Sequence, residues 1–113
     1  MFFRRKYYRV KPEFVENFNV HFNQRLLPAQ QKYGSRLVGR WMMDMEDGTV
    51  EIFAIWEYDN YEEYERIESL VRNDQEHVKR VKDWYEANGG KEHVWNSYFF
   101  EVRNEKITST LMN

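Results

Sequence analysis

Three histidines are the side chains of this 113-residue chain that most readily bind metals or transfer protons near neutral pH. His21, His77 and His93 lie far apart, and none belongs to an i,i+4 pair or an HExxH motif, the spacings that gather imidazoles around zinc. Cysteine is absent, which excludes disulfides, thiolate zinc sites and cysteine-held iron–sulfur clusters. The sequence therefore predicts no metal site, and His21 and His77 are expected to bond a carboxylate or water on the flank of a helix.

Carboxylates gather at Asp44, Glu46 and Asp47, where the alternatives are a cation site and ordinary solvation of a turn. Arg40 is expected to lie on the opposite face of its strand from Trp41. The structural interpretation of Arg40 is an ion pair with Asp44 on that same face, and the functional interpretation is an anionic substrate.

Two tryptophans supply the flat apolar surface that an aromatic ligand needs. Trp41 and Trp56 fall on strands that are expected to pair, so their rings can lie side by side. There they serve as core or dimer-interface aromatics, or they stack beside a flat apolar compound. The choice depends on the elements that position the two rings.

The stretch from Arg36 to Tyr58 positions those rings and has the pattern of two strands joined by a tight turn. Asp47-Gly48 predicts a type I′ turn, which needs positive φ at both central residues. The second strand is apolar on both sides, with one face formed by Val50, Ile52, Ala54, Trp56 and Tyr58 and the other by Phe53 and Ile55. Both faces of this hairpin therefore need cover.

A helix is predicted before the hairpin, from Pro12 to about Tyr33. Proline is favoured at the first helical position, and Gly34 provides a left-handed cap at the other end. Pro28 should kink the helix. The apolar stripe that faces the sheet recurs every four residues, at Phe14, Phe18, Phe22 and Leu26.

The remaining elements are a second helical region and two outer strands. Asp59 is expected to cap the first section of this region, and Asp74 can cap a second section. Trp95 to Val102 has the pattern of the last strand. Phe2 to Val10 is the first strand, and its four cations fit an edge position or a wet cavity because charges are costly in a dry core.

The order of elements is β-α-β-β-α-β, which predicts an α+β, ferredoxin-like fold with a four-stranded antiparallel sheet and helices on one face. The other face keeps an apolar patch that is unusual for a monomer. We therefore expect a homodimer in which two sheets face each other as a dimeric α+β barrel. Residues 1–103 are expected to form the domain, and residues 104–113 a C-terminal tail.

Composition restricts the partners and the location of the chain. The net charge of −2 argues against general affinity for nucleic acid, although residues 1–43 are basic and residues 44–113 are acidic. These halves are expected to neutralise each other within the fold or across a dimer. No run of 18 apolar residues is present, so we expect no membrane span, and the lack of cysteine favours the cytoplasm.

Several short motifs resemble the NIPSNAP family, a branch of the dimeric α/β-barrel superfamily. They are Tyr8-Arg9-Val10-Lys11-Pro12, Leu37-Val38-Gly39-Arg40-Trp41, Ile55-Trp56-Glu57-Tyr58 and Tyr61-Glu62-Glu63-Tyr64. The resemblance covers about residues 3–102 and implies the fold and the dimer, but no set of catalytic residues.

The same superfamily contains cofactor-independent monooxygenases and haem-degrading enzymes. The resemblance to the haem-degrading pattern is incomplete, because that pattern has an Asn on the first strand, a Trp on a sheet strand and a His on the second helix. Trp56 and His77 match in kind, but no Asn lies between Arg4 and Arg9. We therefore expect neither haem nor another cofactor.

A ligand in this architecture would lie between the sheet and its helices. The side chains expected to point there come from different elements, and they are Tyr8, His21, Phe22, Trp41, Trp56 and His77. Such aromatic walls with imidazoles suit a flat, partly polar aromatic compound. We favour a NIPSNAP-like dimer with a small-molecule pocket. The alternatives are a monooxygenase-like enzyme acting on an aromatic or polyketide-like compound, and a non-enzymatic binding or interaction dimer.

Overall fold

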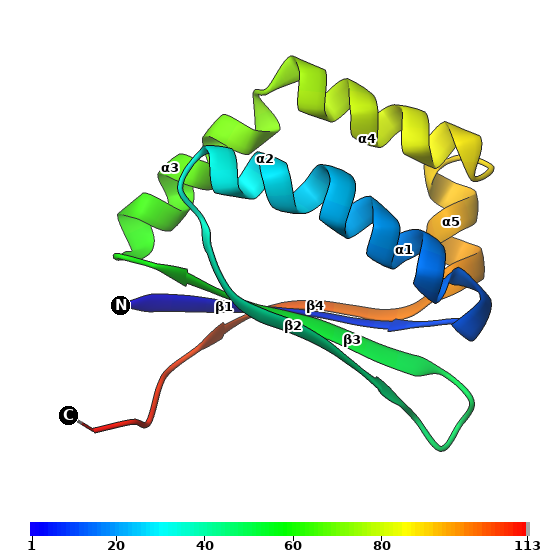
Figure 1. The fold of residues 1–113 in the computed structure, drawn as a ribbon, viewed down its shortest axis with the longest axis horizontal. Coiled ribbons are helices and arrows are strands. Elements are labelled where there is room, and N and C mark those ends of the chain that lie inside the picture. Colours follow the sequence, from blue (N-terminus) through cyan, green and yellow to red (C-terminus); the bar gives the residue numbers. More distant parts are fainter. Residues whose placement is uncertain (113) are drawn as a thin grey trace.

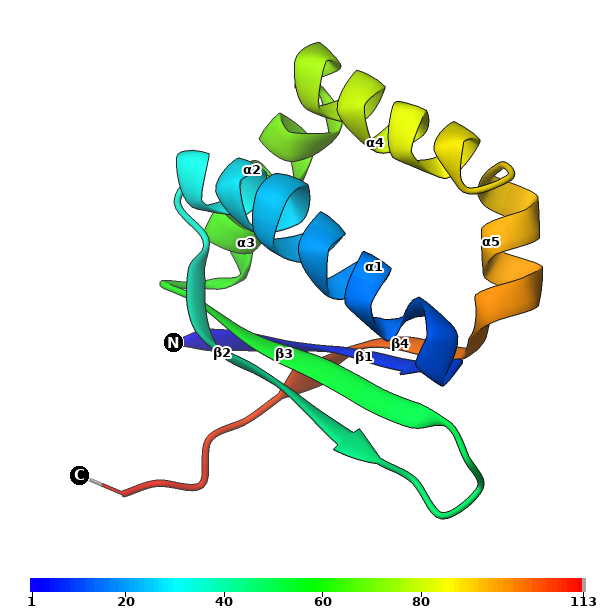
Figure 2. The ribbon, with the colours of Figure 1, turned by 45° about the vertical axis from the view of Figure 1, so that its right-hand side comes forward.

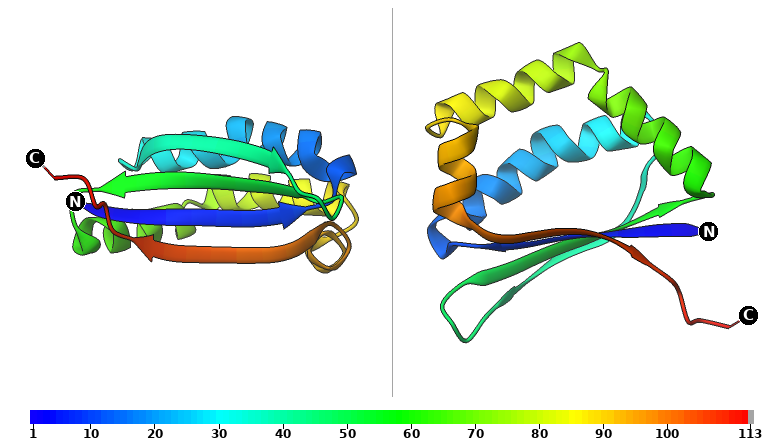
Figure 3. Two further views of the ribbon diagram at one scale, coloured as in Figure 1. Left: turned by 90° about the horizontal axis from the view of Figure 1, so that it is seen from below. Right: turned by 180° about the vertical axis from the view of Figure 1, so that it is seen from behind.

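Four antiparallel strands form one sheet in the computed structural model, which describes residues 1–112 (Figure 1). The strands are β1 (Phe2–Val10), β2 (Arg36–Asp44), β3 (Val50–Tyr58) and β4 (Phe99–Ile107). Their order across the sheet is β2-β3-β1-β4, and the helices lie on one face of it, as Figure 3 shows from below and from behind. The predicted α+β, ferredoxin-like fold is confirmed.

The basic strand β1 is hydrogen-bonded to β3 on one side and to β4 on the other, so its expected position at an edge is wrong. Successive side chains of a strand point to opposite faces. The cations of β1 are therefore divided, with Arg4 and Lys6 on the helix-facing side and Arg5 and Arg9 on the far face, the side of the sheet away from the helices.

The turn between β2 and β3 differs from the predicted type I′ turn. Gly48 has a φ of +84°, but no other described residue of this loop has positive φ. The Met45 N–H donates to the Thr49 carbonyl at 2.9 Å, and the Gly48 N–H donates to the Met45 carbonyl at 3.2 Å. The loop is therefore longer than two residues and ends in a glycine bulge. Asp47 accepts a hydrogen bond from the Thr49 N–H at 3.0 Å, which stabilises this longer form.

The first helical region is continuous but changes its winding. A 3-10 turn (Pro12–Phe14) leads into α1 (Val15–His21), a π-helical turn (Phe22–Leu26) and α2 (Leu27–Lys32). The predicted kink takes the form of the π-helical turn, because Pro28 lacks an N–H and its ring excludes the carbonyl four residues earlier. That carbonyl, on Gln24, accepts a hydrogen bond from Arg80 of α4 at 3.4 Å.

The second helical region is divided into α3 (Tyr61–Arg72) and α4 (Gln75–Ala87). The N-cap of α3 is Asn60 and not the predicted Asp59, because Asn60 Oδ1 accepts the Glu63 N–H at 2.7 Å. The predicted cap at Asp74 is confirmed, since its carboxylate accepts the His77 N–H at 3.1 Å.

The predicted last strand, Trp95 to Val102, begins too early in the chain. Gly90, with a φ of +100°, precedes a third helical region, α5 (Lys91–Tyr98), and β4 begins only at Phe99. Trp95 donates to the Tyr85 hydroxyl at 3.0 Å, so contacts with α4 favour the helix over an extended strand. β4 continues through Ile107 and adds four residues of the predicted tail to the sheet.

The core lies between the helices and the helix-facing side of the sheet. Its two clusters are Val10, Phe14, Phe18, Val50, Ile52, Trp84 and Val94, and Phe22, Ala54, Trp56, Tyr58 and Ile67. β3 is buried at every helix-facing position, whereas Val102 of β4 is 40% exposed. α4 lies further from the sheet than α1 and α2 (Figure 2), so β1 and β4 are less tightly covered. Within residues 1–112, no helix combines the length and the apolar character needed to cross a membrane.

Candidate functional site

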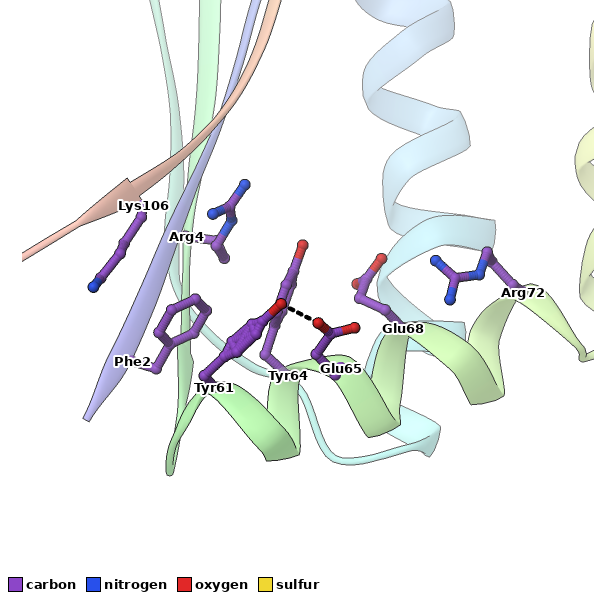
Figure 4. Close-up of a pocket in the computed structure, with 8 residues that line it drawn as sticks. All are labelled: Phe2, Arg4, Tyr61, Tyr64, Glu65, Glu68, Arg72 and Lys106. Carbon is purple, nitrogen blue, oxygen red and sulfur yellow. Dashed lines mark hydrogen bonds between the residues drawn. The ribbon is translucent and has the colours of Figure 1, made fainter.

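A cavity of about 580 Å³ lies between α3 and the helix-facing side of β1 and β4 (Figure 4). Three of the residues that line it are aromatic and five are charged. The aromatic residues are Phe2, Tyr61 and Tyr64, and the charged residues are Arg4, Glu65, Glu68, Arg72 and Lys106.

The aromatic wall is formed by rings that pack on one another. Phe2 lies 5.5 Å from Tyr61 in an edge-to-face arrangement and 5.2 Å from Tyr64, measured between ring centroids. The Tyr61 hydroxyl donates a hydrogen bond to Glu65, which raises the pKa of Tyr61. The wall is therefore apolar and held in place from within α3.

Arg4 is the cation that projects into this cavity from β1. Its Nε donates to Asn104 Oδ1 at 2.9 Å and its Nη2 donates to the Asn104 carbonyl at 2.8 Å. The guanidinium also lies 5.3 Å from the Tyr64 ring centroid. These partners orient Arg4 but carry no charge, so its positive charge stays available to a ligand.

Lys6 is the next residue on the same face of β1 and stands opposite Ala54 of β3 and Asn104 of β4. Its ammonium has no hydrogen bond or ion pair with any residue in the described part of the chain. Burial lowers the pKa of Lys6, while the Glu68 carboxylate acts in the opposite direction. Lys6 is thus a half-buried cation without a direct partner.

Arg40 of β2 stands on the other side of Ala54, whose small side chain leaves room for a guanidinium. Its Nη1 donates to Asn19 Oδ1 at 2.6 Å, and the guanidinium lies 4.2 Å from the Phe22 ring centroid. The buried Nη2 has no hydrogen-bond partner among residues 1–112. Burial lowers the pKa of Arg40 to about 10. The predicted ion pair with Asp44 is not formed, because Arg40 turns toward α1.

Tyr8 follows Lys6 on the helix-facing side of β1. Its ring packs 4.9 Å from Phe18 and 5.8 Å from Phe99. Burial raises the pKa of Tyr8 to about 12, and the nearby charge of Arg40 acts against this rise. The hydroxyl is therefore protonated at neutral pH and can donate a hydrogen bond.

The cations on the two faces of the sheet differ in their partners. On the far face, Arg5 pairs with Glu105 at 2.9 Å and Arg9 pairs with Asp47 at 3.1 Å. On the helix-facing side, none of the cations has a carboxylate partner within the described residues, and these cations are Arg4, Lys6, Arg40 and Lys106. These cations are therefore not paired directly, although Glu65 and Glu68 line the same cavity as Arg4 and Lys106.

Comparison with known proteins decides the family. Residues 3–89 match the NIPSNAP family model. The chain belongs to the NIPSNAP family. Among curated proteins, no sequence matches this NIPSNAP chain.

Three solved structures share the fold of this NIPSNAP chain. A NIPSNAP domain protein from Burkholderia xenovorans is 19% identical, with 97% of this chain and 95% of that one covered and a TM-score of 0.68. A dimeric ferredoxin-like protein from an uncultured marine organism is 13% identical, with coverages of 98% and 97% and a TM-score of 0.53. A putative antibiotic biosynthesis monooxygenase from Bacteriodes thetaiotaomicron is 12% identical, with coverages of 97% and 90% and a TM-score of 0.52.

The structure does not bring the six predicted site residues of this NIPSNAP chain into one cavity. Tyr8, Phe22 and Trp56 do reach the space between the sheet and the helices, and the Phe22 and Trp56 rings are 6.1 Å apart. His77 lies at the start of α4 and lines a separate hollow of about 140 Å³. Their role in ligand binding remains a prediction.

His21 packs on a neighbouring ring and has no polar partner. It is 2% exposed and stacks on Trp84 with a centroid distance of 3.8 Å, and its Nδ1 has no hydrogen-bond partner among the described residues. Burial lowers the pKa of His21 to about 4. The imidazole is therefore neutral near pH 7, and of the two predicted partners, a carboxylate or water, the carboxylate is not found among residues 1–112.

Trp41 lies on the far face, away from the predicted pocket. A bulge between Leu37 and Gly39 shifts the alternation of β2, so Leu37 and Arg40 both face the helices and Trp41 does not. Its ring packs 5.6 Å from Phe53 and lies over Gly39, where an added Cβ would be 2.4 Å from the indole. The expected position of Trp41 beside Trp56 is therefore wrong.

Sequence reasoning missed most of the cavity lining. The four cations of β1 do indicate a polar cavity in the sequence, because a wet cavity is one of the two environments expected for them. The hydrogen-bond partners of these cations cannot be recognised in the sequence, because Asn104 lies 100 residues from Arg4 in the chain. Glu68 and Arg72 have the spacing of an ordinary exposed helix face, and only the fold turns them toward the sheet (Figure 4).

Proposed function

We propose that this NIPSNAP chain is a homodimer that binds a small organic anion with a flat apolar part between α3 and the sheet. The observation that carries the proposal is the cavity of about 580 Å³, in which an aromatic wall faces cations that have no carboxylate partner. A cavity of this size is typical of small-molecule sites, and here the charged residues of the lining outnumber the aromatic ones.

The two walls determine the ligand chemistry that we propose. The rings of Phe2, Tyr61 and Tyr64 favour stacking with an aromatic compound. Arg4 and Lys106 favour a negative charge, whereas Glu65 and Glu68 disfavour a second one. Phe2 and Tyr64 of this wall also pack against the core cluster that contains Phe22 and Trp56, two residues of the predicted site.

Binding of a neutral aromatic probe tests the cavity. N-phenyl-1-naphthylamine should bind saturably at one site per chain and increase in fluorescence. Tyr64→Ala removes part of the wall and should weaken binding about ten-fold, the loss expected for one aromatic contact. Phe100→Ala, which removes a ring that is 49% exposed and outside the cavity, is the matched control. No saturable binding, or equal loss in both variants, contradicts the proposed site.

The dimer is proposed from the far face of the sheet. Trp41 is 48% exposed and Met43 is 55% exposed there, beside Phe53 and Ile55, while the charged residues of this face pair with one another. An apolar surface with internally paired charges is suited to a second copy of itself. One solved structure with the same fold is of a dimeric ferredoxin-like protein. The absence of cysteine supports the cytoplasm as the location of this dimer.

Sedimentation equilibrium tests the dimer directly. At micromolar concentration the mass should be about 28 kDa, which is twice the 14.0 kDa of one chain, as a two-fold pair requires. Phe53→Asp should give a monomer because it places an unpaired carboxylate in the interface. A wild-type protein that sediments as a monomer would rule out the pair.

A monooxygenase-like enzyme is the second candidate, favoured by the half-buried amine of Lys6, which lies on the same face of β1 as the cavity-lining Arg4 and could remove a proton from a bound aromatic compound. With dithranol as the probe, the enzyme should raise oxygen uptake above the rate in buffer alone, and Lys6→Met should abolish the increase. Uptake equal to that in buffer excludes this activity on the probe.

A further inference from the structure

The helix-facing side of β1 holds two donors that no protein group accepts. The Lys6 ammonium and the Tyr8 hydroxyl lack hydrogen-bond partners in the part of the chain that the structure covers. Both residues are half-buried, and both lie on the same face of one strand. Neither donor is fully enclosed, because within residues 1–112 the buried side-chain atoms without a partner are His21 Nδ1 and Arg40 Nη2, so both donors stay accessible to an acceptor that comes from outside the chain.

We infer that Lys6 and Tyr8 form a carboxylate-binding pair on the stretch of β1 that follows the cavity-lining Arg4. This inference rests on the proposed function, because Arg4, two residues before Lys6 on the same face, already lines that cavity. Residues two apart on a strand are separated by roughly 6.8 Å. A carboxylate that accepts one hydrogen bond of about 2.8 Å at each oxygen bridges such a gap.

Arg40 supports this pair from the other side of Ala54. Its guanidinium is held by Asn19 and by the Phe22 ring, so it does not need to move toward the ligand. It is close enough to Tyr8 for the two groups to shift each other's pKa. Arg40 thus adds positive potential behind the Tyr8 hydroxyl and makes it a stronger donor. We regard Arg40 as a positioning residue and Lys6 and Tyr8 as the binding residues.

The charge balance selects a monoanion. Glu68 lines the cavity, and its charge reaches both Lys6 and Tyr8. A phosphate dianion would be repelled by this carboxylate and would bring more acceptor oxygens than the two free donors can satisfy. An aromatic carboxylate matches the donors, the charge and the apolar wall together.

Displacement of N-phenyl-1-naphthylamine by trans-cinnamate and by its neutral isostere cinnamamide tests the inference. In the wild type, cinnamate should compete at least about ten-fold more tightly, the gain expected from one charged hydrogen bond. Lys6→Met should remove the preference for cinnamate, Lys6→Arg should retain most of it, and Tyr8→Phe should reduce it about five-fold. The matched controls are Arg5→Met and Tyr7→Phe, whose side chains lie on the far face.

The outcomes separate the two proposals. If naphthylamine binds but cinnamate and cinnamamide compete equally, the carboxylate pair is wrong and the cavity stands. Tighter competition by phenyl phosphate than by cinnamate overturns the choice of a carboxylate. Loss of the preference in the far-face controls as well as in Lys6→Met assigns it to general charge and overturns the pair. If naphthylamine does not bind saturably, both proposals fail.

Discussion

Arg4 and Arg5 are neighbours in the sequence and lie on opposite faces of the sheet. Arg5 pairs with Glu105 at 2.9 Å, whereas Arg4 bonds the neutral amide of Asn104. The same contrast separates Arg9 from Lys6. The strand that supplies all four cations is the same, so amino-acid preference does not explain the difference. The difference teaches that the position of a cation on one face or the other decides its partner: the far-face arginines pair with carboxylates, whereas Arg4 and Lys6 have no carboxylate partner within residues 1–112.

The two arrangements also differ in what they contribute to stability. Surface ion pairs such as those of the far face contribute about 0–1 kcal/mol each. Unpaired cations near a core lower stability, and proteins retain such features chiefly at functional sites. The two faces should therefore respond in opposite directions to loss of charge and by different amounts to loss of apolar volume.

The largest expected effect is the loss of apolar volume on β3. Ile52, which is fully buried on the helix-facing side, should lose about 2–5 kcal/mol of unfolding free energy when changed to Ala. Ile55→Ala, on the far face of the same strand, should lower the unfolding free energy less than Ile52→Ala does in the monomer. The loss should become larger at protein concentrations where the proposed dimer forms. Urea unfolding at two protein concentrations measures both. If the loss of unfolding free energy in Ile55→Ala is the same at both protein concentrations, this face does not contact a second copy of the chain.

Acid sensitivity should come from the helix-facing side, because the pKa of His21 falls from its ordinary value of 6.5 to about 4 on folding. The unfolded chain then binds more protons than the folded chain between these values, so stability is lost as the pH falls from 6.5 to 4. The loss for this one group is roughly 3 kcal/mol. Thermal unfolding should be less pH-dependent in His21→Gln than in the wild type. A pH dependence in His21→Gln as steep as that of the wild type would contradict the role given to His21.

The smallest effect concerns the cations themselves. Lys6→Met removes a half-buried charge without breaking a pair and should raise the unfolding free energy by about 0.5–1 kcal/mol. Arg5→Met breaks the pair with Glu105 and should lower it by about 0.5 kcal/mol. Chemical denaturation of the two variants and of the wild type measures the sign of each change in unfolding free energy. A loss of stability in Lys6→Met equal to that in Arg5→Met would contradict the distinction between the faces.

The fold was accessible from sequence because it depends on periodic signals. The buried face of β3 and the stripe of Phe14, Phe18 and Phe22 follow directly from strand and helix periods. These two surfaces and the order of the elements are sufficient for the ferredoxin-like topology. The helix in place of the start of the last strand was missed, because Trp95 and Tyr98 fit either period and contacts with α4 decided between them.

The site was accessible only in part, because it depends on single-residue events and distant partners. One extra residue in β2 turns Trp41 to the far face, and no local pattern announces such a bulge. Whether Arg4 meets a carboxylate or an amide depends on its register with β4, nearly a whole chain length away. Periodicity identifies which residues are buried together, but it does not identify their polar partners.

The indole of Trp41 covers Gly39 instead of standing upright on the sheet, since a Cβ at position 39 would be 2.4 Å from the ring. Glycine thus determines how thick the outer layer of the sheet is at this point. Packed sheets are separated by about 10 Å, a spacing that an upright tryptophan opposite another aromatic residue would exceed. In the proposed dimer a flattened indole would permit the close approach of a facing sheet, and a side chain at position 39 would push the ring outward and keep the two copies further apart.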